Sequence, residues 1–171
     1  MSPRAGTGGS RTRRDVHERA LGLLAVRQRS RAELQRRLLG AGFGAQEVAA
    51  ELSRLEQVGL IDDRAFARAV VEHAVRSRGE GRRAVARRLF VAGVDRTIAD
   101  QVVGEMIQDD EAERALELAV SRAGRLGALS PEKAFGRLAG LLARRGFPPE
   151  VARWAARKAL ALETVERTVE S

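Results

Sequence analysis

Apolar residues recur with a helical period along most of the chain. Val16, Ala20, Leu23 and Leu24 fall at positions i, i+4, i+7 and i+8, which places them on one face of a helix. Similar spacing returns in later segments, for example around residues 48–55, 85–92 and 98–106. Alternating strand patterns are absent from the sequence. The pattern therefore predicts an all-α fold.

Polar residues and glycines mark where these helices begin and end. Ser30 and Glu33 form a capping-box pattern, in which hydroxyl and carboxylate would satisfy free backbone N–H groups reciprocally. Asp62 and Ser130 are placed as N-caps, and Pro131 follows Ser130 in the first turn. These signals predict nine helices, over residues 15–27, 30–40, 44–58, 62–77, 81–92, 95–108, 110–124, 130–145 and 148–162.

The nine helices group into three units of three, because one segment recurs. Residues 36–43 (Arg-Arg-Leu-Leu-Gly-Ala-Gly-Phe) align with residues 87–94 (Arg-Arg-Leu-Phe-Val-Ala-Gly-Val), and residues 141–147 are a weaker copy. In each, a glycine can end the helix in a left-handed C-cap. Chance similarity between amphipathic helices is the alternative, since the third unit diverges. We expect three tandem three-helix repeats that stack into an elongated, curved body, over residues 15–61, 62–108 and 109–162.

The two ends of the chain lack this pattern. Residues 1–14 are rich in Gly and Ser and carry four arginines but no acid, which predicts a disordered basic tail. Residues 163–171 are expected to fray.

The charge balance indicates that this helical protein binds an anionic partner. The formal net charge is +8, and Lys133 and Lys158 are the only lysines. A GC-rich genome would explain the preference for arginine over lysine, but it would not explain the net charge. A basic chain of this kind favours nucleic acid or an acidic protein surface as its partner. The chain has no cysteine and no apolar run long enough for a signal peptide or a membrane span, so we expect a cytoplasmic protein.

Catalytic and metal-binding patterns are missing from the sequence. His17 and His73 are the only histidines, and neither belongs to a spaced ligand set. His73 follows Phe66 and Val70 on one helix face, which favours a partly buried structural role. The Asp62-Asp63 pair at a helix start is explained better by capping and the helix dipole than by a metal. We therefore expect no enzyme activity, no metal and no cofactor.

Arginines are concentrated between residues 76 and 88, where Glu80 is the only acid. Arg83 and Arg87 lie four residues apart on the solvent side of a helix whose Val85 and Leu89 face inward. Like charges this close destabilise the fold unless a partner neutralises them, although an ordinary solvated face is the alternative. The expected partner-binding residues are Arg76, Arg78, Arg82, Arg83, Arg87 and Arg88, extended by Arg36, Arg37, Arg144, Arg145, Arg153, Arg157 and Lys158.

Aromatic residues are scarce, and the five phenylalanines lie at apolar or joint positions that indicate packing: Phe43, Phe66, Phe90, Phe135 and Phe147. Trp154, between Arg153 and Arg157, is the one candidate for an exposed contact. A core position in the last helix is the favoured reading for Trp154.

Several ordered motifs resemble the RecX family. One is Arg29-Ser30-Arg31-Ala32-Glu33-Leu34, followed by Gly42-Phe43, and the most characteristic is residues 59–68 (Gly-Leu-Ile-Asp-Asp-Arg-Ala-Phe-Ala-Arg). The match covers about residues 15–161 and departs at Arg82, where the family often has proline. The resemblance implies tandem three-helix repeats. It also implies a protein that binds RecA, lodges in the groove of the RecA–DNA filament, and inhibits RecA ATPase and strand exchange.

Two functions follow as expectations. The leading one is a monomeric, non-enzymatic regulator that binds RecA and the RecA–DNA filament, and contacts acidic RecA surface, single- or double-stranded DNA, or both, with no membrane partner. Whether it blocks filament growth or disassembles filaments stays open. The alternative is a general nucleic-acid binder without a RecA partner, whose binding would fall steeply with salt.

Overall fold

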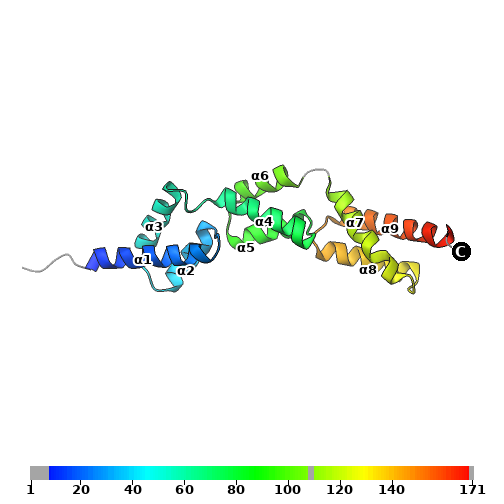
Figure 1. Ribbon diagram of the computed structural model, residues 1–171, viewed down its shortest axis with the longest axis horizontal. Helices are drawn as coiled ribbons and strands as arrows, with labels where there is room; N and C mark the ends of the chain where they lie inside the picture. The colour runs from blue at the N-terminus through cyan, green and yellow to red at the C-terminus, as the bar shows by residue number, and fades with distance from the viewer. Residues whose placement is uncertain (1–7, 108–109, 170–171) are drawn as a thin grey trace, which may run out of the picture.

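The protein is a chain of short α-helices, as the periodicity predicts. The computed structural model describes residues 8–107 and 110–169, which contain nine α-helices, one 3-10 turn and no strand (Figure 1). The helices are α1 (Gly8–Val26), α2 (Arg31–Gly40), α3 (Ala45–Gln57), α4 (Asp63–Arg78), α5 (Arg82–Ala92), α6 (Arg96–Met106), α7 (Glu111–Ala123), α8 (Pro131–Arg144) and α9 (Pro149–Val169), with the 3-10 turn at Gly124–Leu126.

Helix ends inside the chain lie within about two residues of the predicted positions, but both chain ends differ. Helix α1 begins at Gly8, so residues 8–14 are helical and not part of a disordered tail; residues 1–7 lie outside the described part. Helix α9 runs on to Val169, so most of the segment expected to fray is also helical. Extending an existing helix adds a hydrogen bond per residue without a new nucleation step, which explains why α1 starts earlier and α9 ends later than predicted.

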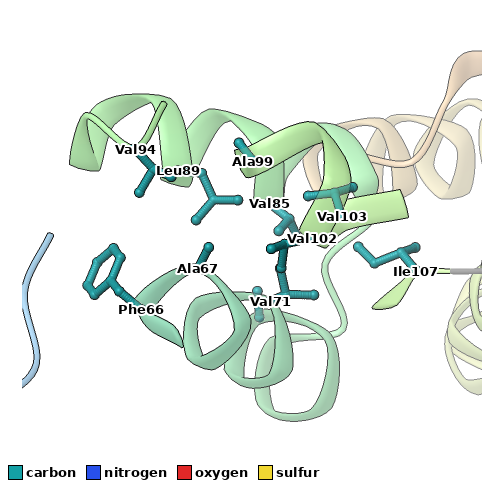
Figure 2. Close-up of a cluster of buried hydrophobic side chains, with 11 residues drawn as sticks. Phe66, Ala67, Val71, Val85, Leu89, Val94, Ala99, Val102, Val103 and Ile107 are labelled. Carbon is teal, nitrogen blue, oxygen red and sulfur yellow. The ribbon is translucent and has the colours of Figure 1, made fainter. Parts of the chain in front are cut away.

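Three repeats of three helices follow one another, and each has its own core. In the first repeat, α1–α3 bury Val16, Leu34, Leu38, Leu52 and Leu55 against one another. The second core, drawn in Figure 2, joins α4, α5 and α6. The third core joins α7, α8 and α9 and is rich in alanine, which lets its helices approach closely. These clusters do not merge, so the repeats meet through other contacts.

The second helices of the repeats, α2, α5 and α8, meet end to end. The C-terminal end of α8 contacts the start of α5: the backbone nitrogens of Gly81 and Arg83 donate to the carbonyl oxygens of Arg145 and Gly146, at 2.8 and 3.0 Å. Free N–H groups at one helix start are thus satisfied by free carbonyls at another helix end. The joint between the second and third repeats therefore includes direct contact between two backbones.

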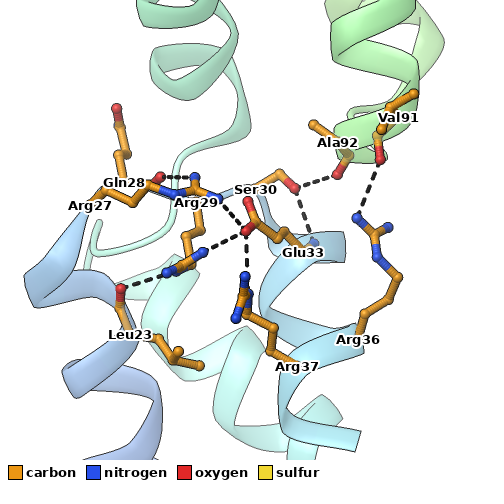
Figure 3. Close-up of polar contacts among 10 residues, drawn as sticks. All are labelled: Leu23, Arg27, Gln28, Arg29, Ser30, Glu33, Arg36, Arg37, Val91 and Ala92. Carbon is orange, nitrogen blue, oxygen red and sulfur yellow. Dashed lines mark hydrogen bonds and ion pairs between the residues drawn. The ribbon is translucent and has the colours of Figure 1, made fainter. Parts of the chain in front are cut away.

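At the joint between the first and second repeats, side chains make the hydrogen bonds between the helix ends. At the C-terminal end of α5, the carbonyl oxygen of Ala92 accepts from the Ser30 hydroxyl at 2.5 Å, and that of Val91 accepts from Arg36 at 3.3 Å (Figure 3). The carboxylate of Asp63, at the start of α4, accepts from the backbone nitrogen of Arg31 at 2.7 Å. Burial raises the pKa of Asp63. Asp63 thus helps to cap α2, in another repeat.

Glycine is required where the joints are closest. A Cβ on Gly81 would lie 2.7 Å from the carbonyl oxygen of Gly146, and a Cβ on Gly93 would lie 2.6 Å from the Cβ of Ala32. Gly93 and Gly146 also adopt positive φ angles of 76° and 87°, as the predicted C-caps require. The recurring glycines therefore end helices and also let neighbouring repeats touch.

Candidate partner-binding groove

An open groove of about 1200 Å³ lies at the joint between the first and second repeats. Helices α2, α4 and α5 contribute most of its wall, and the end of α8 adds one residue. Its apolar floor includes Phe66, Val70 and Ala74, which lie one helical turn apart on α4. The groove exists because the cores of the two repeats remain separate while their second helices touch.

Arginine dominates the polar lining of the groove. Six arginines face two glutamates there: Arg27, Arg36, Arg37, Arg87, Arg88 and Arg144 against Glu33 and Glu80. On α2 and α5 these arginines stand beside the leucines that fill the cores, because buried Leu38 and Leu89 each follow an adjacent arginine pair. Each helix therefore turns its apolar face inward and its cationic face toward the groove.

Glu33 holds one side of the groove together. Its carboxylate accepts from Arg27, from Arg29 at 2.5 Å and from Arg37 at 3.4 Å (Figure 3). Burial opposes ionisation of this group, but the hydrogen bonds from Arg29 and Arg27 outweigh it and hold the pKa of Glu33 below its usual value. Ser30 caps α2 as predicted, accepting from the Glu33 nitrogen at 3.1 Å. The predicted hydrogen bond from the Ser30 backbone nitrogen to the Glu33 carboxylate was wrong, because that carboxylate accepts from the arginines.

Glu80 and Arg88 form the other fixed pair. Two hydrogen bonds, of 2.6 and 2.5 Å, join the Arg88 guanidinium to the two carboxylate oxygens. The hydrogen bond from Arg88 holds the pKa of Glu80 below its usual value, and the pKa of Arg88 is raised in turn. A bidentate pair of this kind fixes both side chains, so Arg88 acts mainly as a structural residue.

Two arginines of the groove remain without a fixed partner. Within residues 8–107 and 110–169, no hydrogen bond or ion pair engages the guanidinium of Arg87 or Arg144. Arg36 binds a backbone carbonyl and so keeps its full charge. The two glutamates are engaged by Arg27, Arg29, Arg37 and Arg88, which leaves positive charge in the groove available to an anion.

The structure divides the expected binding residues into two groups. The groove brings together Arg36, Arg37, Arg87, Arg88 and Arg144, and it adds Arg27, which no motif marked. The others lie elsewhere: Arg76, Arg78, Arg82, Arg83, Arg145, Arg153, Arg157 and Lys158. Several of these have partners of their own.

Those partners explain how the cluster between residues 76 and 88 is tolerated. Arg76 pairs with Glu72 at 2.9 Å, and the Arg82 guanidinium donates to the Ile107 carbonyl at 2.6 Å. Arg145 binds the carbonyl oxygen of Arg78 across the second joint. In the third repeat, Arg157 lies over the Phe135 ring. The arginines therefore do not form one uninterrupted face.

Three side chains differ from their expected surroundings. His73 is exposed, because the α4 face that it shares with Phe66 and Val70 opens into the groove. Phe90 is 81% exposed, since the core takes Leu89 and the next position lies about 100° further around the helix. Trp154 is 41% exposed, with the Lys158 ammonium 5.1 Å from its ring centre, so the core reading of Trp154 was wrong.

Among the described residues, no group of three or more His, Cys, Asp or Glu side chains could hold a metal ion. In the same part of the chain, no helix combines the length and the apolar character that a membrane crossing requires.

Comparison with known proteins agrees with this architecture. The first, second and third three-helix domains of RecX match residues 17–55, 62–103 and 109–155. The RecX regulatory proteins of Amycolatopsis mediterranei and Streptomyces coelicolor are 37% and 38% identical, over 76% and 90% of this chain and 74% and 72% of theirs.

A solved structure shares the fold. The crystal structure of RecX from Lactobacillus salivarius matches 90% of this chain and 99% of its own, with a TM-score of 0.79 at 20% identity. With three domains matched in order and curated relatives at this level of identity, the chain belongs to the RecX family of regulatory proteins.

Proposed function

We propose that this protein binds RecA and RecA–DNA filaments and modulates, mainly by inhibition, RecA ATPase, filament growth and strand exchange in recombination and DNA repair. The observation that carries the proposal is the groove at the first joint, where arginines outnumber carboxylates and Arg87 and Arg144 have no fixed partner among the described residues. The protein acts by binding and not by catalysis, as a monomer in the cytoplasm.

The groove suits an anionic partner for electrostatic reasons. Guanidinium groups bind phosphate and carboxylate with paired, planar hydrogen bonds. In a partly enclosed groove these bonds compete less with water than on a flat surface. An acidic RecA segment or the DNA backbone of the filament would therefore neutralise some of the arginines and lower the repulsion among them.

The elongated body suits a repeating partner. Three repeats in a row (Figure 1) can contact more than one neighbouring subunit of a polymer. A molecule that bridges subunits restrains their motion relative to one another, which accounts for inhibition of both ATP hydrolysis and growth.

The test is RecA-catalysed ATP hydrolysis on single-stranded DNA with substoichiometric amounts of this protein. A double variant, Arg87→Gln with Arg144→Gln, removes the two groove arginines without fixed partners. A matched double variant, Arg76→Gln with Arg96→Gln, removes the same charge from exposed ion pairs outside the groove. We expect the groove variant to inhibit about ten-fold less well, which corresponds to about 1.4 kcal/mol, and the matched variant to inhibit normally.

Two outcomes would contradict the proposal. Absence of inhibition by the unaltered protein at low salt would remove RecA as the target. Equal loss in both double variants would show that net charge matters and the groove does not.

The alternative function is general nucleic-acid binding without RecA. The basic charge favours it, and it predicts tight, steeply salt-dependent DNA binding together with unchanged RecA turnover.

A further inference from the structure

Helix α5 carries two arginines and one phenylalanine on a single exposed face. Arg83, Arg87 and Phe90 lie at positions i, i+4 and i+7, which coincide on one side of a helix. All three side chains are exposed, whereas Val85 and Leu89 on the opposite side are fully buried. The α5 face, as we call these three residues, adjoins the groove at Arg87.

Among the described residues, no acid binds the guanidinium groups of this face. No hydrogen bond or ion pair holds the Arg83 or Arg87 side chain within the described part of the chain, and α5 itself contains no acidic residue. Two acids beside the ends of α5 already have arginines: Glu80 binds Arg88, and Glu111 lies beside Arg82. With respect to the described residues, both cations are thus available to an external anion.

Phe90 is unusually exposed for a large aromatic side chain. Its ring is 81% exposed, and the adjacent Val91 is 68% exposed. Protein-docking hot spots also combine aromatic residues with arginine, but they normally lie within a wider apolar contact area. Here the residues one and two turns away on the same face are cations, a combination that fits alternating bases and phosphates better.

We infer that the α5 face binds single-stranded nucleic acid without sequence preference, with Arg83 and Arg87 on phosphates and the Phe90 ring stacked on a base. Only an unpaired strand can offer the flat side of a base, because in a duplex both sides are covered by neighbouring pairs. The inference rests on the proposed function and deepens it, since it names the strand as a direct partner of the surface beside the groove.

The test measures binding of the full chain to a short fluorescein-labelled oligothymidine by anisotropy. Phe90→Ala should weaken binding about 5- to 150-fold, as expected for loss of one stacked base. Phe90→Leu should weaken binding nearly as much, because leucine keeps the apolar bulk but lacks a π-face. Phe90→Trp should keep the affinity of the unaltered protein, because tryptophan can also stack on a base. Val58→Ala is the matched control, since it trims an exposed apolar side chain that lies outside both the groove and the α5 face and should leave affinity unchanged.

Salt dependence separates the ring from the cations. Replacing Arg83 and Arg87 together by Gln should reduce the slope of log affinity against log salt by about 1.4, since each phosphate contact on a single strand contributes about 0.7. Phe90→Ala should leave that slope unchanged. None of these exposed substitutions should shift the melting temperature by more than about 2 °C, which circular dichroism would check.

Several results would overturn the inference. Unchanged oligothymidine affinity in Phe90→Ala is one, and full affinity in Phe90→Leu is another, because it would indicate apolar contact and not stacking. If Phe90→Ala lost RecA inhibition but bound oligothymidine normally, the ring would dock on protein and the inference would be wrong. If the unaltered chain left RecA unaffected yet showed ring-dependent strand binding, the proposed function would fail and this inference would stand.

Discussion

The backbone nitrogen of Gly81 donates a 2.8 Å hydrogen bond to the carbonyl oxygen of Arg145, 64 residues further along the chain. Through this bond the start of α5 uses the end of α8 as its cap. A side chain at position 81 would enter the space that the Gly146 carbonyl occupies. The contact between the second and third repeats therefore depends on the absence of a Cβ.

Gly81→Ala should accordingly weaken this joint. The added Cβ meets backbone atoms 2.7 Å away, and overpacking of this kind costs about 1–3 kcal/mol. Small-angle scattering should show a larger radius of gyration, and urea unfolding should show reduced stability. Gly44→Ala is the matched control, because Gly44 is also an N-cap with a β-region backbone conformation but has open space around its Cβ position. Equal behaviour of the two variants would show that the joint does not need this glycine.

Ser30→Ala tests the joint between the first and second repeats. The hydroxyl accepts from the nitrogen of Glu33 and donates to the Ala92 carbonyl, so its loss removes a helix cap and an inter-repeat bond together. We expect a loss of about 1–3 kcal/mol in urea unfolding. Ser53→Ala, on the exposed side of α3, should change stability by less than about 0.5 kcal/mol. A Ser30 variant as stable as the Ser53 variant would contradict this account.

Arg87 and Arg88 are neighbours with opposite roles. Arg88→Gln leaves the Glu80 carboxylate, only 10% exposed, without its guanidinium and should cost about 1–3 kcal/mol of stability. Arg87→Gln should leave stability within about 0.5 kcal/mol and weaken partner binding instead. Thermal unfolding measured beside RecA ATPase inhibition would distinguish them. The assignment is wrong if Arg87→Gln destabilises the fold as much as Arg88→Gln.

The same pair predicts a dependence of stability on pH. The pKa of Glu80 is lower in the folded protein than its ordinary value of 4.5, so the unfolded state takes up a proton more readily. The stabilisation is present above pH 4.5 and is lost as the pH falls through the lowered pKa. Glu80→Gln should be less stable than the unaltered protein at neutral pH, and this difference should shrink in acid. Urea unfolding at a series of pH values would test this, and a constant difference would refute it.

Local features of the fold could be predicted from the sequence because they depend on neighbours along one helix. Ser30 and Asp62 cap their helices as their spacing indicates, and Leu38 and Leu89 are buried as the periodicity requires. The left-handed glycines, such as Gly93, recur where the alignment of repeats places them.

The site could be predicted only in part, because it depends on which helix ends meet. Arg29 and Arg37 lie four residues before and after Glu33, a spacing that allows ion pairs. The spacing does not show that Arg27 would join them, or that the carboxylate would bind arginines instead of its own N-cap nitrogen. The environments of His73 and Phe90 depend on where one repeat stops covering the next. Spacing within a helix carries no information about that boundary.

The separation of the three cores has a mechanical consequence. Bending at a joint breaks a few hydrogen bonds but uncovers little apolar surface, whereas bending within a repeat would open a core such as the one around Leu89 and Val102. The molecule is therefore stiff over the length of one repeat and compliant between repeats. A repeat protein built in this way can adjust its curvature to the partner it meets while each of its repeats stays folded.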